Sequence, residues 1–102
     1  MEALICQAIR ELRLIRFYYT GNDTPGERTV EPHLVCINTQ RHIALSAWFL
    51  RGSSESQEGE GWRSYLLSDM RDVVLLDETF SGARPGYNPT GGRMCRSVRC
   101  AL

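Results

Sequence analysis

Two short apolar runs, residues 43–50 and 62–70, limit most strongly what this chain can fold into. Only Ser46 breaks the first run, and the second begins with Trp62. Both runs are short, rich in aromatic residues and bounded by Gly and Ser, which is typical of β-strands rather than helices. A polar loop rich in Ser, Gly and Glu joins them. We therefore expect two strands connected by this loop.

The remaining segments add one helix and about three more strands. Residues 2–13 place apolar side chains on one stripe at helical spacing, which predicts an amphipathic helix that buries one face. Residues 14–19, 28–38 and 73–77 have the composition of strands, and turn-forming residues separate the first two. Pro32 interrupts the second of them. Because proline cannot donate to a strand ladder, we expect it at an edge, bend or bulge.

The number and spacing of these strands favour a small β-barrel. About five short strands within roughly sixty residues suit a barrel better than a sandwich, and closure removes exposed strand edges. A length of 102 residues allows one domain. We expect a mainly β domain over residues 1–79, with one N-terminal α-helix before the barrel. Residues 80–102 are rich in Gly and Pro, which predicts an irregular extension that packs on the barrel.

The balance of charge gives no general attraction for nucleic acid. Twelve acidic residues offset twelve basic ones, and every basic residue is arginine. Arginine fits carboxylates, phosphates and base edges, although codon bias also explains such a composition. Residues 80–102 carry four arginines and no acid, so this basic tail could contact phosphate.

The four cysteines match no compact disulfide framework or zinc motif. Cys95 and Cys100 could form a disulfide within the tail or remain two free thiols. The N-terminus lacks the features of a signal peptide, and no apolar run is long enough to span a bilayer. We therefore expect a soluble cytoplasmic protein that makes no membrane contact, with reduced cysteines as the default.

The loop between the two apolar runs is the first place to expect an anion or small ligand. Arg63 leads the candidates for an anion contact, although a surface salt bridge with Glu58 or Glu60 explains it equally well. Loop serines could donate to phosphate, and nearby aromatic rings could stack on a base or pack in the core. The candidate ligand-binding residues are Arg63, Arg51, Ser54, Ser56, Trp62, Tyr65 and His42.

Motifs for catalysis, metal binding or cofactor binding are missing from the sequence. It contains no phosphate-binding G-x-x-x-x-G-K, no H-E-x-x-H and no nucleophile elbow. A Cys/His pair exists only as composition, in Cys36 with His33 or His42. We expect no enzyme activity, no metal and no cofactor.

Six segments carry a resemblance that extends over residues 4–89. They are Ala8-Ile9, Arg13, Phe17-Tyr18-Tyr19, Arg28-Thr29-Val30-Glu31-Pro32, Gly61-Trp62-Arg63-Ser64-Tyr65 and Arg84-Pro85-Gly86-Tyr87-Asn88-Pro89. In this order they resemble the WYL domain of bacterial transcription regulators and phage-defence proteins. The likeness is closest to its small single-domain members.

The signature tripeptide of that family has two candidate positions here. Trp48-Phe49-Leu50 looks like it with Phe in place of Tyr, whereas the spacing to the next strand favours residues 42–45 in that place. In the favoured register the signature Trp and Tyr are absent. Leu66 and Asp69 stand where many members carry a basic residue, which puts two of the family's cationic ligand contacts in question.

The resemblance implies an SH3-like or Sm-like small β-barrel of about five strands preceded by one helix. It also implies a non-enzymatic regulatory or sensor module that binds a nucleotide or single-stranded nucleic acid, in transcription regulation or phage defence. Such a module would act through a protein partner or as a homodimer. The alternative is a protein-interaction (adaptor) subunit whose exposed aromatic residues bind a partner and which has no small ligand.

Overall fold

The computed structural model of the chain contains one α-helix and six β-strands. It describes residues 1–21, 24–52 and 59–102. Two 3₁₀ turns, Leu67–Asp69 and Gly92–Met94, precede the last two strands. The elements in chain order are α1 Glu2–Glu11, β1 Arg13–Tyr19, β2 Gly26–Asn38, β3 Ile43–Gly52, β4 Gly61–Leu66, β5 Met70–Thr79 and β6 Cys95–Ala101.

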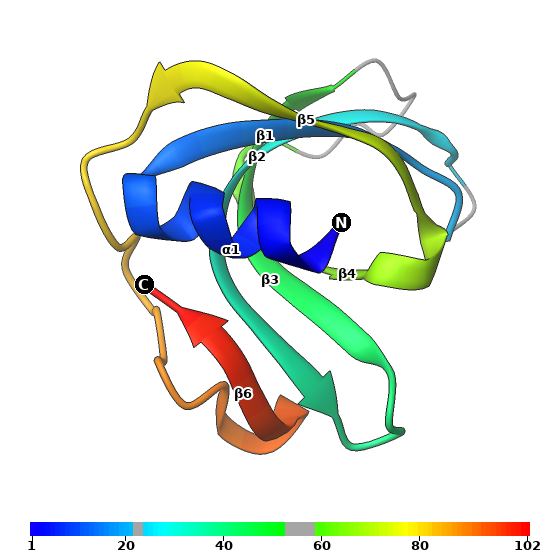
Figure 1. Cartoon of the computed structure of the whole chain (residues 1–102), viewed down its shortest axis with the longest axis vertical. Coiled ribbons are helices and arrows are strands. Elements are labelled where there is room, and N and C mark those ends of the chain that lie inside the picture. The colour runs from blue at the N-terminus through cyan, green and yellow to red at the C-terminus, as the bar shows by residue number, and fades with distance from the viewer. Residues whose placement is uncertain (22–23, 53–58) are drawn as a thin grey trace.

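All of the strands pair antiparallel in one sheet with the order β4-β3-β2-β1-β5. Strand β6 lies off this path and pairs with the second half of β2. The sheet curves so that α1 lies against its concave side (Figure 1). Among the described residues, β4 and β5 do not pair with each other, so the sheet is not closed into a barrel. The prediction of a mainly β fold with an N-terminal helix is confirmed, whereas an SH3-like or Sm-like barrel is not.

Helix α1 buries the stripe that the sequence predicted, since Ile5, Ala8 and Ile9 are its buried residues. It ends at Glu11, two residues earlier than expected. Leu12 adopts a left-handed conformation with φ of 54°, and its N–H bonds back to the carbonyls of Ala8 and Ile9. This conformation ends the helix and turns the chain directly into β1. The helix is ten residues long, and no helix of the described residues is long and apolar enough to cross a membrane.

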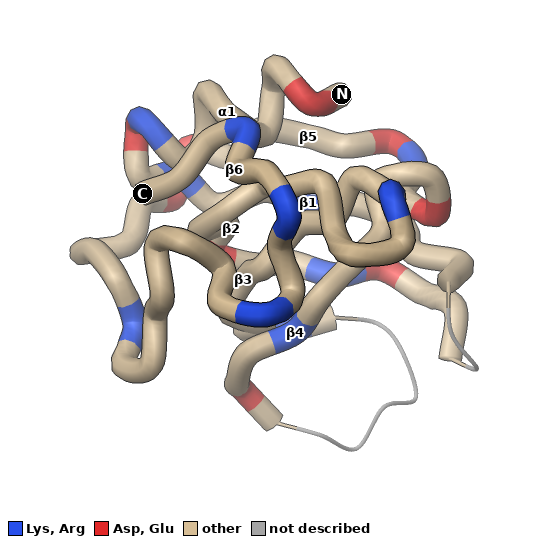
Figure 2. Tube along the Cα trace, turned by 90° about the horizontal axis from the view of Figure 1, so that it is seen from below, with Lys and Arg blue, Asp and Glu red and all other residues tan. Residues whose placement is uncertain are grey.

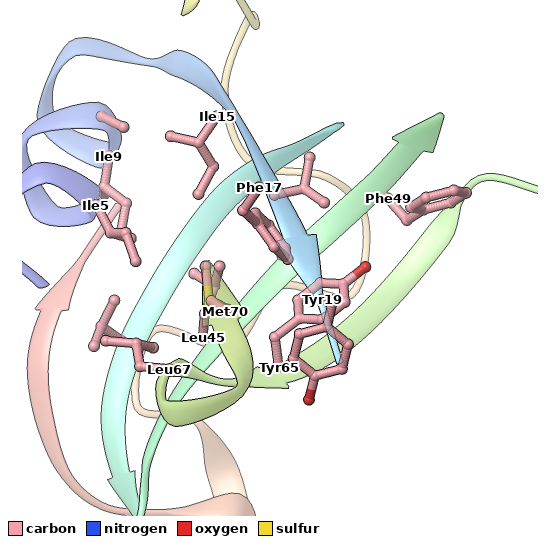
Figure 3. Packing of buried hydrophobic residues seen from close by; sticks show 14 residues of the cluster. Ile5, Ile9, Ile15, Phe17, Tyr19, Leu45, Phe49, Tyr65, Leu67 and Met70 are labelled. Carbon is pink, nitrogen blue, oxygen red and sulfur yellow. The ribbon is translucent and has the colours of Figure 1, made fainter. Parts of the chain in front are cut away.

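The core lies between α1 and the concave face of the sheet (Figure 3). Alternate residues of β1, β3 and β4 enter it, because strand side chains alternate between the two faces. The rings of Phe17 and Tyr19 each meet Tyr65 edge to face, with centroid distances of 5.0 Å and 4.9 Å. Aromatic pairs prefer this geometry, so the three rings fix how β1 packs over β4.

Strand β2 is the central element, and Pro32 divides its pairing. Pro32 lies opposite Ala47 and Leu34 lies opposite Ser46, so the register with β3 shifts between these pairs. This irregularity confirms the prediction that proline falls at a bulge. The bend allows the first half of β2 to pair with β1 and the second half with β6.

The C-terminal segment differs from the irregular extension that the sequence predicted. Residues 80–91 lack helix and strand, as expected, but Cys95–Ala101 forms strand β6. The expectation of a tail disulfide or of free thiols is also wrong. Cys100 pairs with Cys6 of α1 and Cys95 pairs with Cys36 of β2, with Cα–Cα distances of 5.8 Å and 5.7 Å.

An extended strand explains why the two tail cysteines do not pair with each other. Five residues of strand span roughly 16 Å, whereas a disulfide needs Cα atoms about 4.4–6.8 Å apart. Strand β6 instead places each cysteine beside an element that lies far away in the sequence. The two disulfides therefore fasten β6 to both the helix and the sheet.

Candidate functional site

Strand β4 places the predicted ligand-binding residues on two opposite faces of the sheet. Trp62 and Arg63 are neighbours in the strand, so their side chains point to opposite sides. Arg63 and Tyr65 lie on the concave side with the core, and Trp62 lies on the convex side. The structure therefore does not bring all of the predicted residues together into one site.

The first group lies on the concave side of the sheet, on strands β1 to β4. We call it the arginine–tyrosine end; it consists of Arg28, Arg63, Tyr19, Tyr65 and Phe49. The guanidinium carbon of Arg63 lies 5.5 Å from the centre of the Phe49 ring. Arg63 also donates to the carbonyls of Trp62 and Gly59, at 2.8 Å and 2.9 Å. These contacts hold the guanidinium in one orientation.

Tyr65 is only 3% exposed, so its ring has no open face on which a base could stack. Burial raises the pKa of Tyr65 to about 12, and the positive charges of Arg28 and Arg63 act in the opposite direction. The phenol is therefore protonated at neutral pH and lies within the electrostatic influence of both guanidinium groups.

Arg28 is 3% exposed and is not among the residues that the sequence patterns predicted for a ligand site. It donates to the carbonyl of Thr24 at 2.6 Å, and its hydrogen bond with Tyr65 contributes to the pKa of that phenol. Arginine is rarely buried unless it has partners. Its position two residues before the buried Val30 is the signal that could have revealed it, because such residues face the same side of a strand.

The other predicted residues are further from this group or outside the described chain. Arg51 lies in the same end of the sheet but pairs with Glu78 at 2.6 Å. His42 is exposed in the turn before β3, so the ten residues of β3 separate it from the far end of that strand by roughly 30 Å. Ser54 and Ser56 fall outside the described residues.

The convex side of the sheet carries a second group around Trp62. We call it the outer-face cluster; it consists of Glu31, His33, Trp48, Trp62, Phe80, Arg84 and Tyr87. Three of its members come from residues 80–87, which cover this face of β2, β3 and β4. Arg84 binds the buried carboxylate of Glu31 through two hydrogen bonds, and its guanidinium lies 4.9 Å from the centre of the Trp48 ring. The hydrogen bond with Glu31 is the main cause that raises the pKa of Arg84.

His33 is fully buried at the centre of this cluster. Its Nδ1 lies 2.8 Å from the carbonyl oxygen of Glu31, and its Nε2 accepts the backbone N–H of Arg84 at 3.2 Å. These contacts assign the neutral tautomer with the proton on Nδ1. Burial is the main cause that lowers the pKa of His33. Through its hydrogen bond with Arg84, His33 therefore links β2 to the C-terminal segment.

Two of the four arginines of the basic tail are engaged within the protein. Arg84 pairs with Glu31, and Arg99 pairs with Glu2 of α1 at 2.8 Å. Arg93 and Arg96 have no ion pair within the described part of the chain. Figure 2 shows basic positions and no acidic position along β6. This strand therefore forms an exposed basic edge of the molecule.

The fold is a small mainly β domain that carries the two groups on opposite faces of its sheet. Within the described ranges, no cluster of His, Cys, Asp or Glu could hold a metal ion. The model of the WYL domain family matches residues 2–75, and the chain therefore belongs to the WYL domain family. Comparison with curated proteins gives no significant match, and neither does comparison with solved structures.

Membership confirms the resemblance that the sequence motifs carried. WYL domains are in general regulatory ligand-sensing modules of bacteria rather than enzymes. The family match ends at residue 75. It includes the arginine–tyrosine end but only part of the outer-face cluster, since Phe80, Arg84 and Tyr87 lie beyond it.

Proposed function

We propose that this protein is a regulatory sensor that binds an anionic ligand, a nucleotide or a short single-stranded nucleic acid, at the arginine–tyrosine end. It would act in transcription control or phage defence, through a protein partner or as a homodimer. The observation that carries the proposal is the placement of Arg28 and Arg63 around one phenol in a domain of a ligand-sensing family.

The chemistry of this end suits a phosphate. A guanidinium group offers several N–H donors in a planar fork that matches two phosphate oxygens. Backbone carbonyls now accept from Arg63, and an anion would be a stronger acceptor for the same donors. Arg51 lies on the neighbouring strand β3, where Glu78 balances its charge, so the proposal rests on Arg28 and Arg63.

Fluorescence anisotropy with labelled single-stranded and double-stranded oligonucleotides tests the proposal. We expect saturable binding that prefers single strands and weakens with salt, by a slope of about 0.7 for each phosphate contact. Arg63→Lys keeps the charge and loses the fork, whereas Arg63→Ala loses both. Affinity should fall in both variants, and the salt slope should fall only in Arg63→Ala.

Arg10→Ala is the matched control, because Arg10 is exposed on α1 and belongs to neither group. Binding that is unchanged in Arg63→Ala would place the site elsewhere. Absence of binding at low salt, to nucleotides as well as oligonucleotides, would favour the adaptor subunit that binds a protein and no small ligand.

A further inference from the structure

We propose a second ligand site on the convex side of the sheet, which takes a planar nitrogen heterocycle the size of a nucleobase. A pocket of about 210 Å³ opens there between strands β3 and β4 and the segment that precedes β6. Its principal walls are Trp62, Tyr87, Leu34, Met94, Ser46 and Asn88. Because it faces away from the arginine–tyrosine end, the site does not depend on the function proposed above.

Two aromatic rings form flat walls of this pocket and are held in place. The rings of Trp62 and Tyr87 are nearly parallel, with an angle of 20° and a centroid distance of 6.3 Å. The indole N–H of Trp62 donates to the carbonyl oxygen of Pro85 at 2.8 Å. The hydroxyl of Tyr87 donates to the carbonyl oxygen of Leu102 at 3.1 Å. A ring whose polar end is fixed needs little further ordering to bind a flat ligand.

Gly86 allows the chain to approach the indole closely. Its φ is +87°, and a Cβ atom there would lie 3.2 Å from Nε1 of Trp62. Any other residue would be strained in this conformation and crowd the indole. The close approach keeps the segment around Tyr87 next to Trp62.

Two polar groups at the pocket have unused hydrogen-bonding capacity. The side chain of Asn88 accepts from the N–H and the hydroxyl of Thr90 through Oδ1, which leaves its Nδ2 donor without a partner in the described chain. The hydroxyl of Ser46 likewise has no hydrogen bond to any described residue. One amide donor and one hydroxyl suit the edge of a heterocycle that carries ring nitrogens. Small-molecule sites combine apolar walls with a few such polar groups.

The size and charge of the pocket define the ligand further. Sites for drug-sized molecules have volumes of roughly 300–1,000 Å³, so about 210 Å³ suits one ring system rather than a whole nucleotide. None of the eight lining residues is charged, so a neutral ring fits better than a phosphate. The ring could belong to a free nucleoside or to an unpaired base of a single strand.

NMR of the ¹⁵N-labelled full chain, with its disulfides intact, tests this site. The probes are adenosine and ribose, and, in a separate arm, a short deoxyadenosine oligomer and its abasic analogue. We expect adenosine to shift the indole N–H signal of Trp62 saturably, with a dissociation constant on the order of 1 mM or tighter, and ribose to leave it unchanged. The signal of Trp48, which does not line the pocket, should move less.

Ser46→Leu fills the pocket and should weaken adenosine binding at least about tenfold. Ser97→Leu makes the same change on exposed β6 and should not alter it. If Ser46→Leu does not fold, Asn88→Asp serves instead, because it keeps the Oδ acceptor for Thr90 and removes the Nδ2 donor. That variant should weaken binding several-fold.

The oligomer arm identifies the source of the ring. Binding of the oligomer that Ser46→Leu removes would assign the site to a base of a single strand, and binding of adenosine alone would assign it to a free nucleoside. The proposal is wrong if adenosine gives no saturable shift, or if Ser46→Leu and Asn88→Asp both bind as the unaltered chain does. Arg63→Ala should bind adenosine normally, so failure of one proposed site is distinguishable from failure of the other.

Discussion

Arg84 and Glu31, 53 residues apart in the sequence, form a bidentate ion pair on the convex face of the sheet. The distances are 2.8 Å from Nε to Oε1 and 2.9 Å from Nη2 to Oε2. Glu31 is almost fully buried, whereas the side chain of Arg84 is 36% exposed. The pair fastens the segment after β5 to the centre of β2, at the point where Pro32 bends that strand.

Arg84→Ala should destabilise the protein, because it leaves the buried carboxylate of Glu31 without its partner. Removing one member of a fully buried pair costs about 3–5 kcal/mol. Water can reach Arg84, so we expect roughly 2 kcal/mol in the free energy of unfolding measured with urea. Glu31→Gln combined with Arg84→Ala should cost less than the sum of the single changes. If the cost of the double change equals the sum of the two single costs, Glu31 and Arg84 are not energetically coupled. Arg99→Ala, which breaks the exposed pair with Glu2, should have a smaller effect.

His33 should make stability depend on pH near neutrality. Its pKa in the folded protein is below the ordinary 6.5, mainly because of burial. The unfolded chain therefore binds a proton first as pH falls, so stability is full above about pH 6.5 and decreases below it. The loss continues until the folded-state pKa is reached. Glu31 and Arg84 are the charged neighbours, and their effects on the pKa of His33 oppose each other.

Urea unfolding between about pH 8 and pH 5 measures this dependence. His33→Phe removes the titrating group and should flatten the curve in that range, from a lower starting stability. A slope that persists unchanged in His33→Phe would assign the effect to other groups. His42→Phe is the matched control, because His42 is exposed in a turn.

Tyr65 should cause a loss of stability at alkaline pH. Its pKa rises from the model-peptide value of 10.0 to about 12 in the folded protein. The protonated phenol therefore favours the folded state, with its full contribution below about pH 10 and a loss of up to roughly 2–3 kcal/mol as pH rises toward 12. Absorbance of the phenolate during a pH titration measures the pKa of Tyr65. Tyr65→Phe should remove the ionisation step near pH 12, and Tyr18→Phe, at an exposed position, should retain it.

The two disulfides should account for a large part of the stability. They join residues 94 and 59 positions apart, and cross-links over such loops contribute about 2–5 kcal/mol each. Cys36→Ser combined with Cys95→Ser should lower Tm clearly in calorimetry, and reductant should lower Tm of the unaltered chain. Four free thiols in the native protein by mass spectrometry of alkylated samples would contradict the prediction.

Local sequence determined most of the sheet. Short runs of apolar, aromatic and β-branched residues predicted β1 to β5, the helical stripe predicted α1, and Pro32 predicted the irregularity in β2. The family followed from short motifs of the same segments. These features depend on neighbours along the chain, since propensity, turn chemistry and side-chain alternation act over a few residues.

Only the tertiary structure determines the conformation and the disulfide pairing of the C-terminal part. Strand β6 has mostly exposed residues and no apolar alternation, so it exists because β2 offers it a partner edge and because Cys36 of β2 and Cys6 of α1 bind its two cysteines. Four cysteines allow three pairings, and spacing in the sequence does not select among them. Strand alternation separates Trp62 from Arg63, but which of the two faces the core depends on which face of the sheet meets the helix, and so does the burial of Arg28. Such contacts join residues far apart in the sequence, and only the folded chain brings them together.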